Sequence, residues 1–428
     1  MTRPSDLEIL NPKRVSEAQT GRASWYPYYA GFSEKFAERL IASARLNTAS
    51  IVSDPWNGSG TTTAAAAGNG HDAFGCDLNP VMVLAARARM LSKREKHSLI
   101  PLAAAIANGS LSKATTHDEP LGDWFNPSAA AALRNLELAI QALLVSNNAS
   151  FRVLTAREIA RISDLAAFFY VALFRTTRGL LTRFEASNPT WFKKPGSSSA
   201  RLRSLPETIS MLFRQQVKAM ADAIPNDPLS KDSDVTITLN SSEKIPLEDE
   251  AVDFILSSPP YCTRIDYAFA TRIELAVLGY RADEFDELRR SLIGTATVPK
   301  GTCEAQKDWG RTCTRFLERL KSHPSKASAT YYFKNHVQYF TSMYDSLGEL
   351  TRTLKKKGAC ILVVGDSYYK EVHNDLPKIV TEMGKSHGLV LRRSEVFRQR
   401  QTMARVNPNV RKYRSRVDAA ESVLCFSH

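Results

Sequence analysis

The sequence predicts an α/β fold: an open, mainly parallel sheet of seven strands, interrupted by one large helical insertion. Three observations lead to this prediction. Short apolar runs alternate with stretches of helical periodicity, β patterning nearly disappears between residues 91 and 230, and it resumes at residue 235. The predicted strands are 49–53, 73–76, 235–239, 252–257, 359–364, 389–397 and 421–426.

The helices are predicted from apolar residues that recur every three or four positions. Ser33 stands where an N-cap would support the first of them, and Pro80 suits the first turn of another. A Trp-, Pro-, Gly- and Ser-rich connection at 187–199 must be irregular. The predicted helices are 35–46, 61–67, 80–90, 129–144, 156–181, 205–223, 332–355 and 374–386. The expected parts of the chain are a polar leader (1–24), a first core part (25–90), the insertion (91–230) and a second core part (231–428).

Composition excludes several classes of protein. The 428 residues are 43% hydrophobic and 24% charged, which is typical of a folded globular chain. No apolar run reaches the roughly 18 residues of a membrane span, and the start lacks the apolar stretch of a signal peptide, so we expect a cytoplasmic protein. The six cysteines are scattered, without a CxxC pair or zinc spacing, so we expect neither a disulfide framework nor a bound metal.

The net charge of +13 is unevenly distributed. Residues 152–218 contain 12 basic and 4 acidic residues, and residues 392–416 contain 9 basic and 1 acidic residue. These segments together carry +16, so the rest of the chain is nearly neutral at −3. Two basic patches on a neutral body indicate a polyanionic partner, with a merely solvated basic surface as the alternative.

A glycine-rich loop, DPWNGSG at residues 54–60, follows the first predicted strand. In open α/β sheets, ligands bind at the carboxyl ends of the strands. Gly58 and Gly60 would let the backbone approach a ligand closely, and the helix that follows offers free N–H groups to a carboxylate. Asp77 ends the second strand, where an acid can accept hydrogen bonds from ribose hydroxyls. The loop is neither GxGxxG nor GxxxxGK[ST], so it matches no dinucleotide or P-loop fingerprint.

The tetrapeptide Ser258-Pro259-Pro260-Tyr261 ends the fourth predicted strand, at the same edge. Its prolines lack N–H groups and Pro259 holds Ser258 extended, which makes a rigid turn that presents a hydroxyl and carbonyl oxygens. These acceptors can bind the hydrogens of an exocyclic amine and expose its lone pair to an electrophilic methyl group. Tyr261 provides a flat face for an extruded base. An ordinary turn is the alternative interpretation of this tetrapeptide.

These motifs resemble those of the S-adenosylmethionine-dependent amino-methyltransferases of DNA. The segment 25–33 (WYPYYAGFS) resembles the family's N-terminal cofactor motif, residues 54–62 resemble its DPFxGSGTT loop, and Ser258 to Tyr261 resemble its catalytic tetrad. Gly365-Asp366-Ser367 is similar to a later element near the target base. The resemblance implies a Rossmann-like class I methyltransferase sheet that binds S-adenosylmethionine and releases S-adenosylhomocysteine. The implied cofactor-binding residues are Tyr28, Phe32, Asp54, Trp56, Gly58, Gly60, Thr61, Thr62, Asp77, Asn240 and Ser241; the implied catalytic residues are Ser258, Pro259, Pro260 and Tyr261.

Serine in the first place of the tetrad implies, within this family, the N4 amine of cytosine as the target. Asp or Asn there usually implies adenine N6. C5 methylation is disfavoured because it needs a cysteine directly after the prolines, whereas Cys262 follows Tyr261 and is interpreted as a packing residue. Adenine N6, an amino group of RNA, and a cofactor-sensing nucleic-acid-binding protein without turnover are the alternatives.

The insertion is a departure from the family pattern and our first candidate for target recognition. The expected partner is double-stranded DNA, with the target base flipped out, and a cognate restriction endonuclease is a further expected partner. Residues 295–326 are the rival recognition segment, and the basic residues near the C-terminus lie in a predicted hairpin that could reach the phosphates. The candidate nucleic-acid-binding residues are Asn188, Trp191, Lys193, Lys194, Arg398, Arg400, Arg405, Arg411, Lys412 and Arg414.

Overall fold

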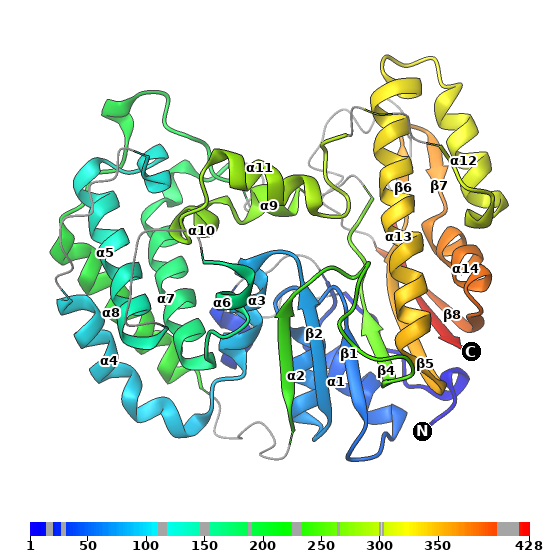
Figure 1. Ribbon diagram of the computed structural model, residues 1–428, viewed down its shortest axis with the longest axis horizontal. Helices are drawn as coiled ribbons and strands as arrows, with labels where there is room; N and C mark the ends of the chain where they lie inside the picture. Colours follow the sequence, from blue (N-terminus) through cyan, green and yellow to red (C-terminus); the bar gives the residue numbers. More distant parts are fainter. Residues whose placement is uncertain are drawn as a thin grey trace.

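A computed structural model of the chain describes residues 1–13, 20–26, 31–109, 118–145, 154–186, 191–224, 233–262, 266–298, 301, 304–399 and 419–428. Within these residues lies a seven-stranded sheet with the order β3-β2-β1-β4-β5-β9-β8 (Figure 1). Its strands are β1 (Ile51–Asp54), β2 (Asp72–Asp77), β3 (Val235–Leu239), β4 (Val252–Ser257), β5 (Leu354–Gly365), β8 (Val390–Gln399) and β9 (Ala419–Ser427).

The pairing of these strands confirms the predicted fold class. Strands β3, β2, β1, β4 and β5 pair in parallel, and β9 lies antiparallel between β5 and β8. Every predicted strand is found in this sheet. The sequence did not predict a separate two-stranded ribbon, β6 (Ser367–Tyr369) with β7 (Val372–Asn374).

Most predicted helices are found, and one prediction is wrong. Ser33 caps α1 as expected, because its side chain accepts a hydrogen bond from the backbone of Phe36. The single helix predicted for 156–181 is instead two, because Ser163 caps a new helix by accepting from the backbone of Ala166. The helices are α1 (Glu34–Ala44), α2 (Thr61–Gly68), α3 (Pro80–Arg89), α4 (Lys96–Asn108), α5 (Pro127–Leu144), α6 (Ala156–Ile159), α7 (Asp164–Leu180), α8 (Pro206–Asp222), α9 (Tyr267–Ala270), α10 (Arg272–Val277), α11 (Ala282–Ser291), α12 (Arg311–Lys321), α13 (Phe333–Thr353) and α14 (Leu376–Ser386).

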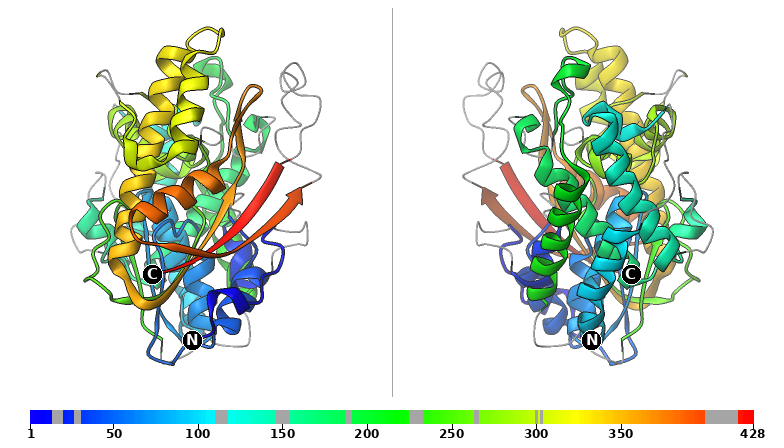
Figure 2. Two further views of the ribbon diagram at one scale, coloured as in Figure 1. Left: turned by 90° about the vertical axis from the view of Figure 1, so that its right-hand side faces the viewer. Right: turned by 90° about the vertical axis from the view of Figure 1, so that its left-hand side faces the viewer.

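The central strands β1, β4 and β5 are buried on both faces, which explains why they contain nearly continuous apolar runs, whereas the edge strands β3 and β8 are more exposed. Successive side chains point to opposite faces. In β4, Phe254 and Leu256 join the core under α1 and α2, whereas Ile255 joins the core beneath α13 and α14. The side views show helices on either side of the strands (Figure 2).

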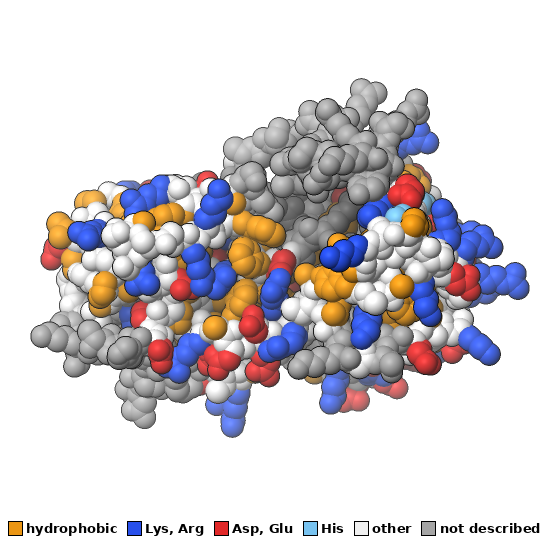
Figure 3. All heavy atoms as spheres, turned by 90° about the horizontal axis from the view of Figure 1, so that it is seen from above, with side chains coloured by type: hydrophobic (Ala, Val, Ile, Leu, Met, Phe, Trp, Pro, Cys, Tyr) orange, Lys and Arg blue, Asp and Glu red, His pale blue; other side chains and the backbone are white. Residues whose placement is uncertain are grey.

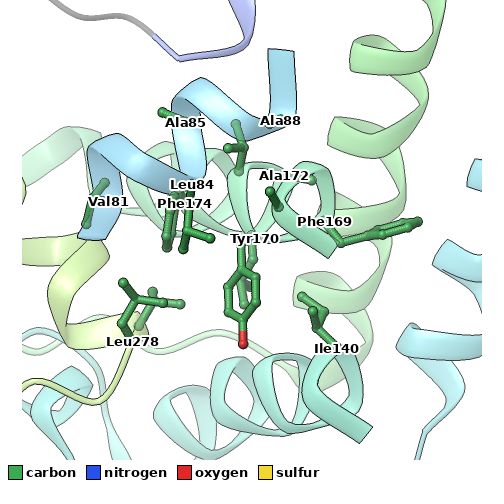
Figure 4. Close-up of a cluster of buried hydrophobic side chains, with 14 of the residues drawn as sticks. Val81, Leu84, Ala85, Ala88, Ile140, Phe169, Tyr170, Ala172, Phe174 and Leu278 are labelled. Atoms are coloured by element: carbon green, nitrogen blue, oxygen red, sulfur yellow. The ribbon is translucent and has the colours of Figure 1, made fainter. Parts of the chain in front are cut away.

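The helices between β2 and β3, α3 to α8, pack together with α10 into a core of their own. Figure 4 shows side chains of α3, α5 and α7 meeting in this core, and Tyr170 extends its hydroxyl from α7 toward α5. That hydroxyl donates to Glu137, 3.0 Å away. The buried Tyr170 hydroxyl therefore has a partner, as buried polar groups need.

Two arginines connect this helical group to the chain that follows the SPPY tetrapeptide. Arg134 of α5, only 1% exposed, donates to the carbonyl oxygens of Ala276 and Val277 at 2.9 and 2.6 Å. Arg178 of α7 donates to the carbonyl of Ala270 at 2.7 Å and also pairs with the buried Glu274. Both cations thus satisfy carbonyl groups at the C-terminal ends of α9 and α10.

Candidate functional site

The glycine-rich loop lies at the carboxyl end of β1, beside the ends of β2 and β4. Gly60 has φ +82°, and a Cβ atom there would lie 2.8 Å from the Cβ of Ala86, so only glycine fits. Gly58, with φ +48°, donates its N–H to the Asp77 carboxylate at 3.0 Å. The loop predicted to hold a cofactor is therefore shaped by backbone geometry that its glycines permit.

Asp54 connects this loop to the strand that carries the tetrad. Its carboxylate accepts hydrogen bonds from the hydroxyls of Ser257 and Thr62 and from the backbone N–H of Trp56. Ser257 is the last residue of β4 and directly precedes Ser258. Burial raises the pKa of Asp54 to about 6, and these three donors partly oppose that rise.

Asp77 ends β2 with a carboxylate that still has acceptor capacity. It accepts from the backbone N–H groups of Gly58 and Asn79, at 3.0 and 2.8 Å, whereas a carboxylate can accept about four hydrogen bonds. Burial raises its pKa to about 6. Asn240 lies next to it, because its N–H donates to the Asp77 carbonyl at 3.2 Å, and Ser241 follows with its hydroxyl accepting from the backbone of Glu243.

The residues of the loop fit a nucleoside cofactor. Among the described residues, the Trp56 indole N–H and the Asn57 amide nitrogen are buried without a hydrogen-bond partner. Asn57 packs on Gly75, where a Cβ atom would lie 2.5 Å from its side chain. Thr61 is buried at the start of α2. Unpaired donors, two glycines with positive φ and an acid at the end of the next strand form a site that can hold a ligand with donor and acceptor groups.

The described aromatic residues of the N-terminal segment 25–33 lie in different parts of the structure. Tyr28 lies outside the described residues. Phe32 is 4% exposed and packs on Phe36 of α1, with ring centroids 5.2 Å apart. Trp25 and Tyr26 enter the helical group, where Trp25 donates to the Met220 carbonyl at 3.0 Å and Tyr26 to Glu274 at 3.0 Å. The contact of Phe32 with a cofactor therefore stays a prediction.

The SPPY tetrapeptide, Ser258 to Tyr261, which is predicted to be catalytic, forms hydrogen bonds with three different elements. The Ser258 hydroxyl donates to the Val363 carbonyl of β5 at 3.0 Å. The Pro260 carbonyl accepts from the Tyr339 hydroxyl at 2.9 Å, and the Tyr261 N–H donates to the Tyr267 hydroxyl at 3.2 Å. Hydrogen bonds therefore hold both the Pro260 carbonyl and the Tyr261 N–H of this turn, in addition to the rigidity that its prolines provide.

The side chain of Tyr261 lies on the end of the β5–β9 strand pair. Its hydroxyl donates to Glu421 of β9 at 2.8 Å, and its ring edge lies so close to Gly365 that a Cβ atom there would be 2.4 Å from Cε1. This contact gives Gly365 of the GDS element a function, namely to make room for the tyrosine. Cys262 is buried in the core, as predicted from its position.

The sequence analysis missed the residues that hold the tetrad: Tyr267, Tyr339 and Glu421. They lie on α9, α13 and β9, and no motif marks them. The local sequence signals for these contacts are two glycines, Gly365 beside the fifth predicted strand and Gly294, because both leave room for Tyr261. A Cβ atom at Gly294 would lie 2.8 Å from the Tyr261 carbonyl oxygen.

Some of the candidate nucleic-acid-binding residues lie on described surface. Trp191 is 39% exposed and lies beside Phe269 of α9, with ring centroids 4.9 Å apart, so part of its ring is accessible to a partner. Lys193 and Arg398 are exposed, and Lys194 forms an exposed pair with Asp123 at 2.6 Å. The other candidates, Asn188, Arg400, Arg405, Arg411, Lys412 and Arg414, lie outside the described residues.

The basic charge of the 152–218 segment is partly structural. Arg175 donates to the carbonyl oxygens of Ser24 and Trp25 and to Gln216, and Arg178 pairs with Glu274. These two cations are therefore committed to internal contacts. Seen from above, Lys and Arg side chains are spread over both halves of the molecule, with hydrophobic side chains gathered between them (Figure 3).

The strand order, with the glycine-rich loop after β1 and the SPPY tetrapeptide after β4, is that of an open Rossmann-like α/β sheet and is consistent with a methyltransferase fold. Comparison with known proteins confirms the resemblance stated from the sequence. Residues 7–87 match the family model described as DNA methylase, of the N6/N4 methyltransferase type. Methyltransferases of this family use S-adenosylmethionine as the methyl donor.

Curated relatives extend the similarity over most of the chain. It is 24% identical to the Type II methyltransferase M.BsoBI of Geobacillus stearothermophilus over 86% of this chain and 73% of that protein. It is 21% identical to M.AvaI of Nostoc over 85% and 78% of the two chains, and 21% identical to M.MvaI of Kocuria varians over 78% and 74%. All three are Type II methyltransferases.

Two expected absences concern the described residues alone. Among them, no helix is long and apolar enough to cross a membrane. In the same ranges, no group of three or more His, Cys, Asp or Glu side chains could hold a metal ion.

Proposed function

We propose that the protein is a site-specific DNA methyltransferase that transfers the methyl group of S-adenosylmethionine to the N4 amine of a cytosine flipped out of the duplex. The observation that carries this proposal is the position of Ser258. It directly follows Ser257, the last residue of β4, which is bonded to the Asp54 carboxylate of the cofactor loop. An amine held by Ser258 would therefore lie beside the cofactor.

The hydrogen bonds of the tetrad favour Ser258 as an acceptor. Because its hydroxyl hydrogen is directed to the Val363 carbonyl, the lone pairs of its oxygen are available to the amine hydrogens. The Pro260 carbonyl already accepts from Tyr339, whereas no described residue donates to the Pro259 carbonyl. We infer that Ser258 and the Pro259 carbonyl accept the two amine hydrogens.

The bound cofactor supplies an electrophilic methyl group, and the tetrad orients the amine for a direct, in-line transfer. The amine proton leaves to water after the transfer, since an ordinary serine is a poor base. Cys262, the cysteine next to the tetrad, takes no part, because it is buried in the core and no covalent intermediate is needed. Proximity and orientation provide much of the rate acceleration.

The proposed substrate is double-stranded DNA, and the exposed surface around Trp191 and Phe269 supports it. Aromatic side chains with nearby cations suit contacts to nucleic-acid bases. Arg272 lies over the ring of Phe269, with 5.5 Å from its guanidinium carbon to the ring centroid. We also propose a cytoplasmic, nucleoid-associated location and a cognate restriction endonuclease as partner, in keeping with the Type II relatives.

Nucleoside mass spectrometry of DNA and RNA tests the proposal. Both are taken from cells that express the chain and compared with cells that express Tyr261→Ala, which should bind the cofactor but turn over poorly. The expected result is N4-methylcytosine in DNA with the wild-type chain and little with the variant. Only N6-methyladenine in DNA would contradict the base assignment, and methylation confined to RNA would contradict the substrate. Cofactor binding by the purified protein without any methylation would favour a sensing protein instead.

A further inference from the structure

We propose that Glu421 is a positioning residue for the catalytic turn, because it fixes the ring of Tyr261 against which the target base stacks. This inference rests on the proposed methyl transfer and deepens it. No motif points to Glu421, which lies 160 residues after Tyr261 and on the far side of the β4–β5 strand pair.

The first step is the geometry of the tyrosine. Its hydroxyl donates to Glu421 Oε1 at 2.8 Å, and its ring edge contacts Gly365. Glu421 and Gly365 are directly paired across the β5–β9 ladder. One residue pair of the sheet therefore holds the tyrosine at two points, the hydroxyl and the ring edge.

The second step is the physical effect of this arrangement. The Tyr261 backbone is already held by Tyr267 and, through Pro260, by Tyr339, and the bond from its hydroxyl to Glu421 acts on the orientation of the ring. A hydrogen bond to a carboxylate is short and stronger than one between neutral groups. It restricts rotation of the side chain before the base arrives, so less ordering remains for the moment of binding.

The third step is the place of Glu421 in the strand. Sheet partners hold it on both sides, because β9 lies between β5 and β8 and Glu421 pairs with Gly365 on one strand and Phe397 on the other. The backbone that carries the carboxylate is thus held rigidly in the sheet, as a positioning residue requires. Glu421 is the third residue of β9 and lies five residues after Arg416, the end of the basic segment 392–416.

A double-mutant cycle tests the proposal. The variants are Tyr261→Phe, which keeps the ring and removes the donor, Glu421→Ala, Glu421→Gln, and the double variant Tyr261→Phe with Glu421→Ala. Glu395→Ala is the matched control, since Glu395 lies on the neighbouring strand β8 and pairs with Arg393 away from the tetrad. For each protein, we would measure kcat, KM for DNA, cofactor Kd by calorimetry, and flipping by the fluorescence of 2-aminopurine at the mapped target position.

If Glu421 acts through the Tyr261 hydroxyl, each single substitution should lower kcat by about tenfold, with the cofactor Kd unchanged. Glu421→Gln, which keeps an acceptor, should lose less. The double variant should be no slower than Tyr261→Phe alone, because the second change removes a partner already lost. The flipping signal should fall in Tyr261→Phe and Glu421→Ala and stay unchanged in Glu395→Ala.

The proposal would be overturned if the reductions in kcat of the two single variants multiplied in the double variant. It would also be overturned if Glu421→Ala kept the kcat and the flipping signal of the wild type. If Glu421→Ala does not fold, the comparison of Glu421→Gln with and without Tyr261→Phe gives the same decision. The failure of the proposed function looks different, because the wild-type chain would then transfer no methyl group to DNA. In that case the wild-type chain would show neither a kcat nor base flipping against which the variants could be compared, and the positioning role would be rejected together with the proposed function.

Discussion

Ser257, the last residue of β4, donates its hydroxyl hydrogen to Asp54, the last residue of β1. The two strands are neighbours in the sheet. This bond joins the loop predicted to bind the cofactor to the turn predicted to be catalytic, and it uses a carboxylate that burial makes unfavourable to ionise. The arrangement predicts that Asp54 lowers the stability of the protein at neutral pH.

Asp54→Asn should show this effect. The folded-state pKa of about 6 lies above the ordinary aspartate value of 3.8, so the folded protein binds the proton more tightly and loses stability as pH rises from about 4 to 6. The shift corresponds to about 3 kcal/mol of lost stability above pH 6. In urea unfolding at pH 4.5 and pH 7.5, the free energy of unfolding of the variant should therefore increase relative to that of the wild type as pH rises. The exposed control Asp286→Asn should show no such gain, and an equal gain there would contradict the prediction.

Asp77 should govern the pH dependence of cofactor binding. Ribose hydroxyls donate to its ionised form, so S-adenosylmethionine affinity should rise between about pH 5 and 7 and level off above the Asp77 pKa of about 6. Asp77→Ala should weaken binding by about 1 to 3 kcal/mol, and Asp77→Asn should flatten the pH profile. Calorimetry from pH 5 to 7.5 measures both, with Asp72→Asn at the opposite end of β2 as control. An unchanged affinity in Asp77→Ala would remove Asp77 from the cofactor site.

Tyr339→Phe should weaken the catalytic turn without affecting the cofactor. The substitution leaves the Pro260 carbonyl without the hydroxyl that now lies 2.9 Å away. Loss of one such bond should lower the free energy of unfolding by about 1 kcal/mol and reduce kcat several-fold. The control is Tyr344→Phe on the same helix, whose ring lies 4.2 Å from the ring of His387 instead. Similar kinetics in both variants would mean that Tyr339 is only part of the core.

Gly365→Ala should impair turnover by displacing Tyr261. The added Cβ atom would lie 2.4 Å from the tyrosine ring, a separation that real contacts do not allow. We expect kcat to fall by about tenfold or more while the cofactor Kd stays within about twofold. Gly179→Ala in α7 is the control, because nothing lies within 4 Å of its added Cβ atom and alanine should stabilise the helix by about 0.5 to 1 kcal/mol. Full activity of Gly365→Ala would show that the ring can move without consequence.

The basic segment near the C-terminus should determine the salt dependence of DNA binding. Each neutralised phosphate contributes a slope of about −0.9 in log K against log salt on duplex DNA. Replacing Arg411, Lys412 and Arg414 by alanine should reduce the slope and weaken all sequences alike, whereas Trp191→Ala should change which sequences are methylated. Alanine at Lys356, Lys378 and Lys385, which are exposed elsewhere, removes the same charge as a control. Equal slopes for the first triple variant and the wild type would make the segment a solvated surface.

Much of the fold was predictable because its signals are local. Seven apolar runs became the seven strands, the Ser33 cap was correct, and the two motifs fell at the ends of β1 and β4. The break between α6 and α7 was missed because apolar periodicity continues across it, and only the cap at Ser163 distinguishes the two helices. Local patterns also contain nothing about strand order, so the insertion of β9 between β5 and β8 had to come from the structure.

The site was predictable in its motifs and not in its supports. The glycines and acids of the cofactor loop form a recognisable run, as do Ser258 to Tyr261. The hydroxyl of Tyr339 and the carboxylate of Glu421 reach the tetrad from 79 and 160 residues away. Such contacts depend on helix packing and strand register, which a single sequence does not reveal.

The arginine bonds between the helical group and the chain after the tetrad have an evolutionary consequence. Arg134 and Arg178 are fitted to the carbonyl groups of residues 270, 276 and 277, and Trp25 is fitted to the Met220 carbonyl. A helical group transplanted from a relative would leave these buried groups unpaired unless residues 20–26 and 266–280 came with it. New target specificities in this lineage should therefore arise by co-inheritance of three separate stretches of the gene, or by substitutions at the exposed edge around Trp191, and not by exchange of residues 91–230 as a cassette.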